Sequence, residues 1–238
     1  MAPPKNIPPF TGFPKELFRF LDELAANNNR EWFAANRDRY EKFYLEPSWA
    51  YIQAVQSKLG TISSQMVGSS KSGPGSSKAL MRIYRDTRFS KDKTPYKTNV
   101  GLSFRHRLLS DIHAPGFYVH LASDECFLVG GSWMPPREAL QLIRQTIDED
   151  RPAWKKVIHN KKFTSQFTIS GGSLKSAPRG YSLDHPLIED IRRTSYCAVA
   201  PLKRTDVLRK DFADVSIEQF RQTRPLMKFL CDALGIPY

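Results

Sequence analysis

The feature that most constrains the fold is a change of hydrophobic period near residue 80. Before residue 60, apolar side chains recur every three or four residues, as along one face of a helix. After residue 80, short segments rich in β-branched and aromatic residues alternate with turn residues, which is typical of strands. Helices, then strands, then mixed elements favour an α+β fold with a largely antiparallel sheet.

The first sixty residues predict three helices that can lie antiparallel. Pro14 opens the first, whose inward face holds Phe13, Leu17, Leu21 and Leu24. The asparagines at 27–29 end it and cap a second helix over about residues 30–44. A third helix starts at the proline at 47 and stops at the glycine at 60.

The middle of the chain predicts short strands over residues 80–89, 100–105, 116–122 and 126–129. The turn at 123–125 joins the last two in a hairpin, and Gly130-Gly131 is expected to break the strand. Further helices are predicted after Pro136, around Trp154 and over 186–194, and a strand over 196–202. The last helix is predicted to begin at a capping box of Ser216 and Gln219, and Pro225 to kink or divide it.

Length and composition predict one domain. The chain has 238 residues, 40% of them hydrophobic, which suffices for a substantial core. The Gly/Ser-rich stretch at about 66–78 is predicted to be a mobile surface loop. No run of about 18 apolar residues occurs, so we expect no membrane-spanning helix and no membrane partner. The N-terminus does not resemble a signal peptide, and three widely spaced cysteines favour a reducing, cytoplasmic setting.

The charge favours anionic partners. Lys and Arg number 36 against 24 Asp and Glu, which gives a net charge of +12. A chain this basic suits a small anionic molecule, and nucleic acid as an alternative, but charge alone does not choose between them. Common nucleotide-binding and hydrolase motifs are absent from the sequence, which names no cofactor.

Residues 82–97, with the sequence R-I-Y-R-D-T-R-F-S-K-D-K-T-P-Y-K, are the segment most indicative of chemistry. They hold six basic and two acidic residues, so 6 − 2 gives +4. The first half alternates like a strand, yet it has polar side chains on both faces, which is costly unless they are paired or liganded. The second half is expected to be a loop, because Asp-Lys-Thr-Pro favours a turn.

We therefore predict an anion-binding site here, for a phosphate or a carboxylate. Two aspartates, Asp86 and Asp92, are the candidates for orienting the basic groups or for acid–base catalysis. The remaining candidates supply charge or the wall of the site: Arg82, Tyr84, Arg85, Arg88, Lys93, Tyr96 and Lys97. The alternative is an internal network of ion pairs that only joins the strand to the loop.

Two other clusters are weaker. In the segment 178–186, Arg179 is a candidate to bind the same anion, whereas Asp184 or His185 is better explained as a cap for the helix after Pro186. Histidines recur at 106, 113 and 120, but seven-residue spacing has no meaning across strands and turns. With no cysteine beside them, we predict no metal site.

The motif at 82–97 resembles the signature of an uncharacterised family of conserved hypothetical proteins, domain of unknown function 2461. Further blocks carry the resemblance: F-T-G-F at 10–13, N-N-R-E-W-F at 28–33, P-G-F-Y at 115–118, P-R-G-Y at 178–181 and D-H-P at 184–186. It covers most of the chain and is specific as to family. It implies no established activity, cofactor or catalytic residue, so whether the chain is an enzyme stays open.

Overall fold

The computed structural model describes residues 6–68, 79–108 and 114–238. Within these residues, six strands form one antiparallel sheet in the order β1-β2-β3-β4-β6-β5. Their bounds are β1 Met66–Val67, β2 Asn99–His106, β3 Gly116–Ala122, β4 Cys126–Ser132, β5 Thr168–Ser170 and β6 Tyr196–Leu202. The predicted α+β class with an antiparallel sheet is confirmed. Most of the predicted Gly/Ser-rich loop lies outside the described residues, and its first two residues form β1.

The N-terminal helices are α1 Lys15–Ala26, α2 Arg30–Ala35, α3 Arg37–Arg39, the π-helix η1 Tyr40–Leu45 and α4 Glu46–Leu59. The predicted inward face of α1 is buried, and the Asn29 side chain caps α2 by accepting from the Trp32 N–H. The prediction of one helix over 30–44 is wrong. Asn36 ends α2, because its backbone leaves the helical conformation at φ −109° and ψ 20°. Its side-chain amide also donates to the Trp32 carbonyl at 2.9 Å.

The C-terminal helices are α5 Arg137–Glu149, α6 Arg151–Ile158, α7 Lys161–Thr164, α8 Ile188–Ile191, α9 Arg204–Val207, α10 Phe212–Gln222 and α11 Arg224–Ala233. Pro225 stands in the first turn of α11, so the predicted division of the last helix is confirmed. The predicted capping box is wrong, because Ser216 lies inside α10. The Ser216 hydroxyl accepts from Tyr51 Oη at 2.7 Å and donates to the Phe212 carbonyl at 2.8 Å.

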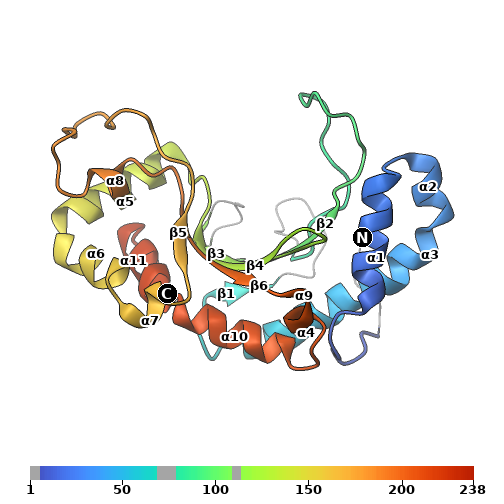
Figure 1. The fold of residues 1–238 in the computed structure, drawn as a ribbon. Coiled ribbons are helices and arrows are strands. Elements are labelled where there is room, and N and C mark those ends of the chain that lie inside the picture. The colour runs from blue at the N-terminus through green and yellow to red at the C-terminus, as the bar shows by residue number, and fades with distance from the viewer. Residues whose placement is uncertain (1–5, 69–78, 109–113) are drawn as a thin grey trace.

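Helices cover one face of the sheet. Alternate residues of the strands, such as Leu102, Val119 and Leu128, are fully buried against the cover that α4, α10 and α11 form on that face. Figure 1 shows residues 80–97 and the segment between β5 and α8 extending along opposite sides of the other face. Within the described parts of the chain, every helix is too short or too polar to cross a bilayer.

The predicted end of β4 at residue 129 is also wrong, because the strand continues through Gly130 and Gly131. Gly130 pairs with Phe117 and Ala198, and Gly131 with Gly116 and Cys197. A Cβ on Gly130 would lie 2.4 Å from Thr223 Oγ1, and one on Gly131 would lie 2.1 Å from the Tyr196 carbonyl oxygen. The glycines thus allow close packing inside the sheet and do not end it.

Candidate functional site

Residues 80–97 form an extended arm at the edge of the sheet, hereafter the arm. In place of the predicted strand at 80–89, single bridges join Leu80 to Leu102 and Tyr84 to Tyr96. The base of the arm is anchored: Tyr96 is buried, stacks on Phe33 at 4.1 Å, and its backbone bonds the Asn28 side chain at 2.9 and 3.1 Å.

Arginines and aspartates in the outer arm are paired with one another. The Arg88 guanidinium binds both oxygens of Asp86, with Nη2 to Oδ2 at 2.7 Å. Arg85 bonds Asp92 and the Thr94 hydroxyl, and Asp92 Oδ1 accepts from the Thr94 N–H at 2.9 Å. For these two arginines and two aspartates, the contacts are those of an internal ion-pair network, the alternative to an anion-binding site.

The pKa values of both aspartates fall far below the ordinary range. The hydrogen bond from Arg88 lowers the pKa of Asp86 to about 2, and the Thr94 N–H with Arg85 lowers that of Asp92 to about 2. Carboxylates this acidic stay ionised near neutral pH and accept protons poorly. Their geometry suits orientation of the arginines better than acid–base catalysis.

The other predicted residues are dispersed. Arg82 and Tyr84 are exposed, and Lys93 Nζ donates to the Thr87 carbonyl at 2.9 Å. Arg179 is exposed in the segment between β5 and α8. In that segment His185 accepts from the Leu187 N–H at 3.1 Å. The predicted cap is wrong, because α8 begins at Ile188 with Leu187 as its N-cap, and no side chain of the described residues caps it.

The open face of the sheet holds a cavity of about 690 Å³, hereafter the sheet groove. Its floor comes from alternate residues of β2, β3, β4 and β6, and the base of the arm and the start of the β5–α8 segment form its sides. The residues that carry its chemistry are Lys97, Arg105, Tyr118, Glu125, Phe127 and Trp133. Among the predicted site residues, Lys97 alone lines it.

Two cations lie on the wall of the sheet groove. Lys97 is half-buried, and its ammonium makes no hydrogen bond or ion pair with any described residue. Burial lowers the pKa of Lys97, with the nearby charge of Arg82 as the second cause. Arg105 is 7% exposed, and its Nε donates to Ser103 Oγ at 2.9 Å. The half-buried ammonium of Lys97 is poorly hydrated there, which favours an incoming anion.

A row of polar side chains from β3 and the turn after it adjoins the sheet groove. Tyr118 Oη lies 3.1 Å from His120 Nδ1, and His120 Nε2 lies 3.9 Å from Glu125 Oε1. Asn99 Nδ2 lies 3.5 Å from the same Nδ1, so two donors face it and the imidazole proton belongs on Nε2, toward Glu125. Burial raises the pKa of Tyr118 to about 12, so its hydroxyl stays protonated. The row could relay a proton to a ligand in the groove.

His120 is expected to titrate below its ordinary pKa of 6.5, because burial outweighs the attraction of Glu125 and Asp124. The folded protein then takes up this proton at lower pH than the unfolded chain. The stability that His120 contributes is complete above pH 6.5 and is lost as the pH falls through the folded pKa.

Tyr118→Phe should raise the pKa of His120. The hydroxyl of Tyr118 donates to Nδ1 and so stabilises the neutral imidazole, and the variant loses that hydrogen bond. The measurement is the pH titration of the His120 Cε1–H signal by NMR, assigned with a His120→Gln variant. A midpoint that stays or falls in Tyr118→Phe would contradict the hydrogen bond from Tyr118 to Nδ1.

A thiolate nucleophile is disfavoured in the groove. Cys197 lines it, yet burial raises the pKa of its thiol to about 12. Binding and proton transfer are the chemistry that the remaining side chains can supply.

A family model described as conserved hypothetical protein (DUF2461) matches residues 16–229. The chain belongs to this family. The family predicted from the sequence is therefore confirmed. A search of curated proteins found no match to this chain. A search of solved structures also found none. Membership in the DUF2461 family brings no named activity.

Sequence reasoning missed most of the sheet groove. The signal was present in the alternation of β2 and β3, where Ser103, Arg105 and Tyr118 occupy the face opposite the core. Those polar residues indicate a face that a helix does not cover. The contribution of Phe127 and Trp133 was harder to see, because it depends on strand order and on Gly130-Gly131 continuing β4.

Proposed function

We propose that the sheet groove binds a small ligand that carries a phosphate or carboxylate together with a flat apolar group. The observation that carries this proposal is the half-buried ammonium of Lys97, which has no counter-ion among the described residues. Keeping a partly desolvated cation unpaired costs free energy, and an anion in the groove would remove that cost. The predicted anion site then lies at the base of the arm and not along its tip.

The apolar requirement follows from the rest of the lining. Phe127, Val129 and Val199 form an apolar floor, and Trp133 stands beside it with 54% of its surface exposed. Flat ligands pack well on such aromatic and β-branched surfaces. Tyr118 adds a neutral hydroxyl as a hydrogen-bond donor, which is where any enzymatic proton transfer would begin.

The arm has a structural part in this proposal. Its ion pairs Arg85–Asp92 and Arg88–Asp86 hold the outer loop, while Ile83 and Tyr96 are buried at its base. Because Lys97 follows Tyr96 directly, anchoring of that ring positions the ammonium. The motif at 82–97 thus contributes one cation to the sheet groove, Lys97, and the arm that positions it.

We place the protein in a reducing, cytoplasmic setting. Cys126, Cys197 and Cys231 are all free and buried, and burial raises the pKa of each thiol. Buried thiols of this kind act as small apolar core residues.

Lys97→Met should abolish stabilisation by an anionic aromatic probe. Phenyl phosphate is the probe, with inorganic phosphate and phenol as its two halves, and thermal unfolding is the measurement. In the wild type, phenyl phosphate at about 100 times its Kd should add about 2.7 kcal/mol to the free energy of unfolding. Each half alone should do less, and Lys97→Met should show little effect.

The matched control is Lys91→Met, which removes the same charge from an exposed position of the arm. It should keep the wild-type response to phenyl phosphate. The proposal fails if phenyl phosphate leaves the wild type unchanged, or if Lys97→Met is stabilised as much as Lys91→Met.

A further inference from the structure

A second cavity, of about 410 Å³, lies where α7 meets the junction of α10 and α11. Four cations line it, Lys162, Arg221, Arg224 and Lys228, against the single carboxylate of Glu218, so 4 − 1 gives +3. We call these four side chains the basic stripe. None of them lines the sheet groove.

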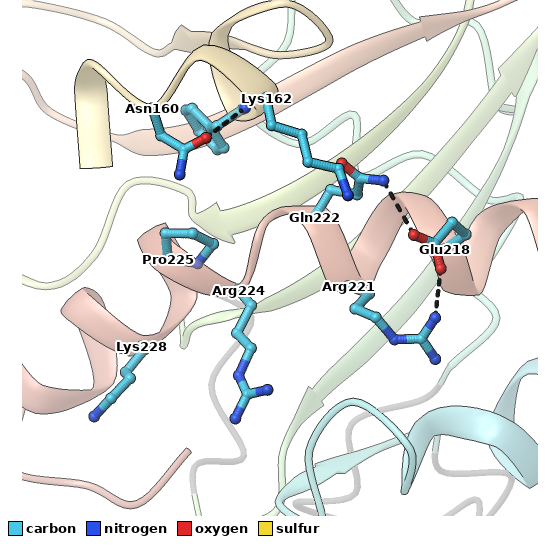
Figure 2. A pocket seen from close by; sticks show the side chains of 9 residues that line it. Asn160, Lys162, Glu218, Arg221, Gln222, Arg224, Pro225 and Lys228 are labelled. Carbon is cyan, nitrogen blue, oxygen red and sulfur yellow. Dashed lines mark hydrogen bonds and ion pairs between the residues drawn. The ribbon is translucent and has the colours of Figure 1, made fainter. Parts of the chain in front are cut away.

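The basic stripe is a row and not a converging pocket. Arg221, Arg224 and Lys228 are spaced by three and four residues, which places them along one side of the helices. Thr223, between α10 and α11, keeps a helical backbone with φ −78° and ψ −2°, so the row continues across the junction. At 1.5 Å per residue it spans roughly 10 Å. Figure 2 shows these three side chains diverging from the helices.

The cations of the stripe can turn to an outside anion. Arg221 pairs with Glu218, and Lys228 pairs with Asp232 at 3.2 Å. Both partners of each pair are exposed, and exposed ion pairs are weak. Arg224 and Lys162 make no ion pair with any described residue. All four cations are therefore available to ligands that offer several negative charges.

We propose that the basic stripe binds the phosphate backbone of double-stranded nucleic acid without reading its sequence. Successive phosphates of one strand rise by about 3.4 Å, so a row of roughly 10 Å faces about three of them. A converging site would suit one phosphate, whereas a diverging row suits a repeated one. This inference is independent of the ligand proposed for the sheet groove.

The apolar surroundings favour a duplex over two other polyanions. Every large apolar side chain that is exposed in the described part of the chain lies outside the stripe. Insertion into a membrane surface needs an exposed apolar side chain, and a single strand needs an exposed ring for its bases to stack on. Phosphate contact alone remains, which is the sequence-independent mode of duplex binding.

The test is fluorescence anisotropy with a labelled duplex of mixed sequence, about 20 base pairs long, over about 50 to 200 mM salt. About three phosphates along the row and a fourth at Lys162 give a slope of log affinity against log salt of about −3.6. The variant Lys162→Gln/Arg224→Gln/Lys228→Gln should reduce the magnitude of that slope by about 2.7 and weaken binding at low salt.

A charge-matched control decides the outcome. Lys15→Gln/Lys91→Gln/Lys175→Gln removes three charges from exposed positions elsewhere and should keep the wild-type slope. If both triple variants lose the same amount of slope and affinity, the proposal for the basic stripe is overturned, because binding would then reflect net charge alone. Absence of binding at low salt would also overturn it, as would equal stripe-dependent binding to vesicles of anionic phospholipid. Lys97→Met should bind the duplex like the wild type, which separates this result from the ligand test.

Discussion

Gly131→Ala is expected to destabilise the protein by about 3 to 5 kcal/mol, because two penalties act at one residue. Gly131 has φ +151°, a backbone conformation that side chains with a Cβ rarely adopt. Its added methyl would also lie 2.1 Å from the Tyr196 carbonyl oxygen and 2.9 Å from the Cys197 Cα on the neighbouring strand. Backbone atoms cannot rotate away, so β4 and β6 would have to separate.

Chemical denaturation followed by circular dichroism measures this effect. The control is Gly60→Ala, at the C-terminal end of α4, where φ is −58° and no atom lies within 4 Å of an added Cβ. That change should be neutral or stabilise by up to about 1 kcal/mol, because it reduces only the entropy of the unfolded chain. Equal stability of the two variants would show that β4 does not pass Tyr196 this closely.

Gly131 also shows where sequence patterns are misleading. Two consecutive glycines after an alternating segment predict the end of a strand, and that prediction was wrong here. The reason for the glycines lies in residues far along the chain, Tyr196 and Thr223, which approach β4 from β6 and from the α10–α11 junction. The sequence around residues 130 and 131 does not indicate such long-range contacts.

Other elements were predictable because their determinants are local. The predicted bounds 116–122 and 196–202 are those of β3 and β6, and β3 alternates in burial along most of its length. Helix α1 followed from four apolar residues on one face. The capping box at Ser216 was also predicted from a local pattern, and it is wrong. The helix starts four residues earlier, and the Ser216 hydroxyl accepts a hydrogen bond from Tyr51.

The candidate site divides in the same way. The motif at 82–97 identified Lys97, and the composition suggested an anionic ligand. The sequence could not show whether Arg85 and Arg88 bind a ligand or pair with Asp92 and Asp86, as they do in the structure. Such a choice depends on a turn geometry that places Thr94 and Asp92 beside Arg85. The sheet groove itself depends on which face of the sheet the helices leave open.

Trp154→Ala should lower the free energy of unfolding by about 3 to 5 kcal/mol, since it empties a fully buried site. The indole packs edge-on against Tyr196 at 5.8 Å and lies 5.1 Å from Phe229. These residues belong to a second hydrophobic cluster around α5, α6 and α11, separate from the larger cluster under β2, β3 and α4.

The Trp154 variant also tests the prediction of one domain. The sheet spans both clusters, with Leu128 of β4 in the first and Ala198 and Ala200 of β6 in the second. We therefore expect calorimetry to show one transition that shifts as a whole in Trp154→Ala; a split into two transitions would indicate two separate folding units. Leu142→Ala, at a residue of α5 that is 45% exposed, is the control and should change little. Trp154→Phe should cost less than alanine, because it keeps the ring and removes an indole N–H that is buried without a hydrogen-bond partner among the described residues.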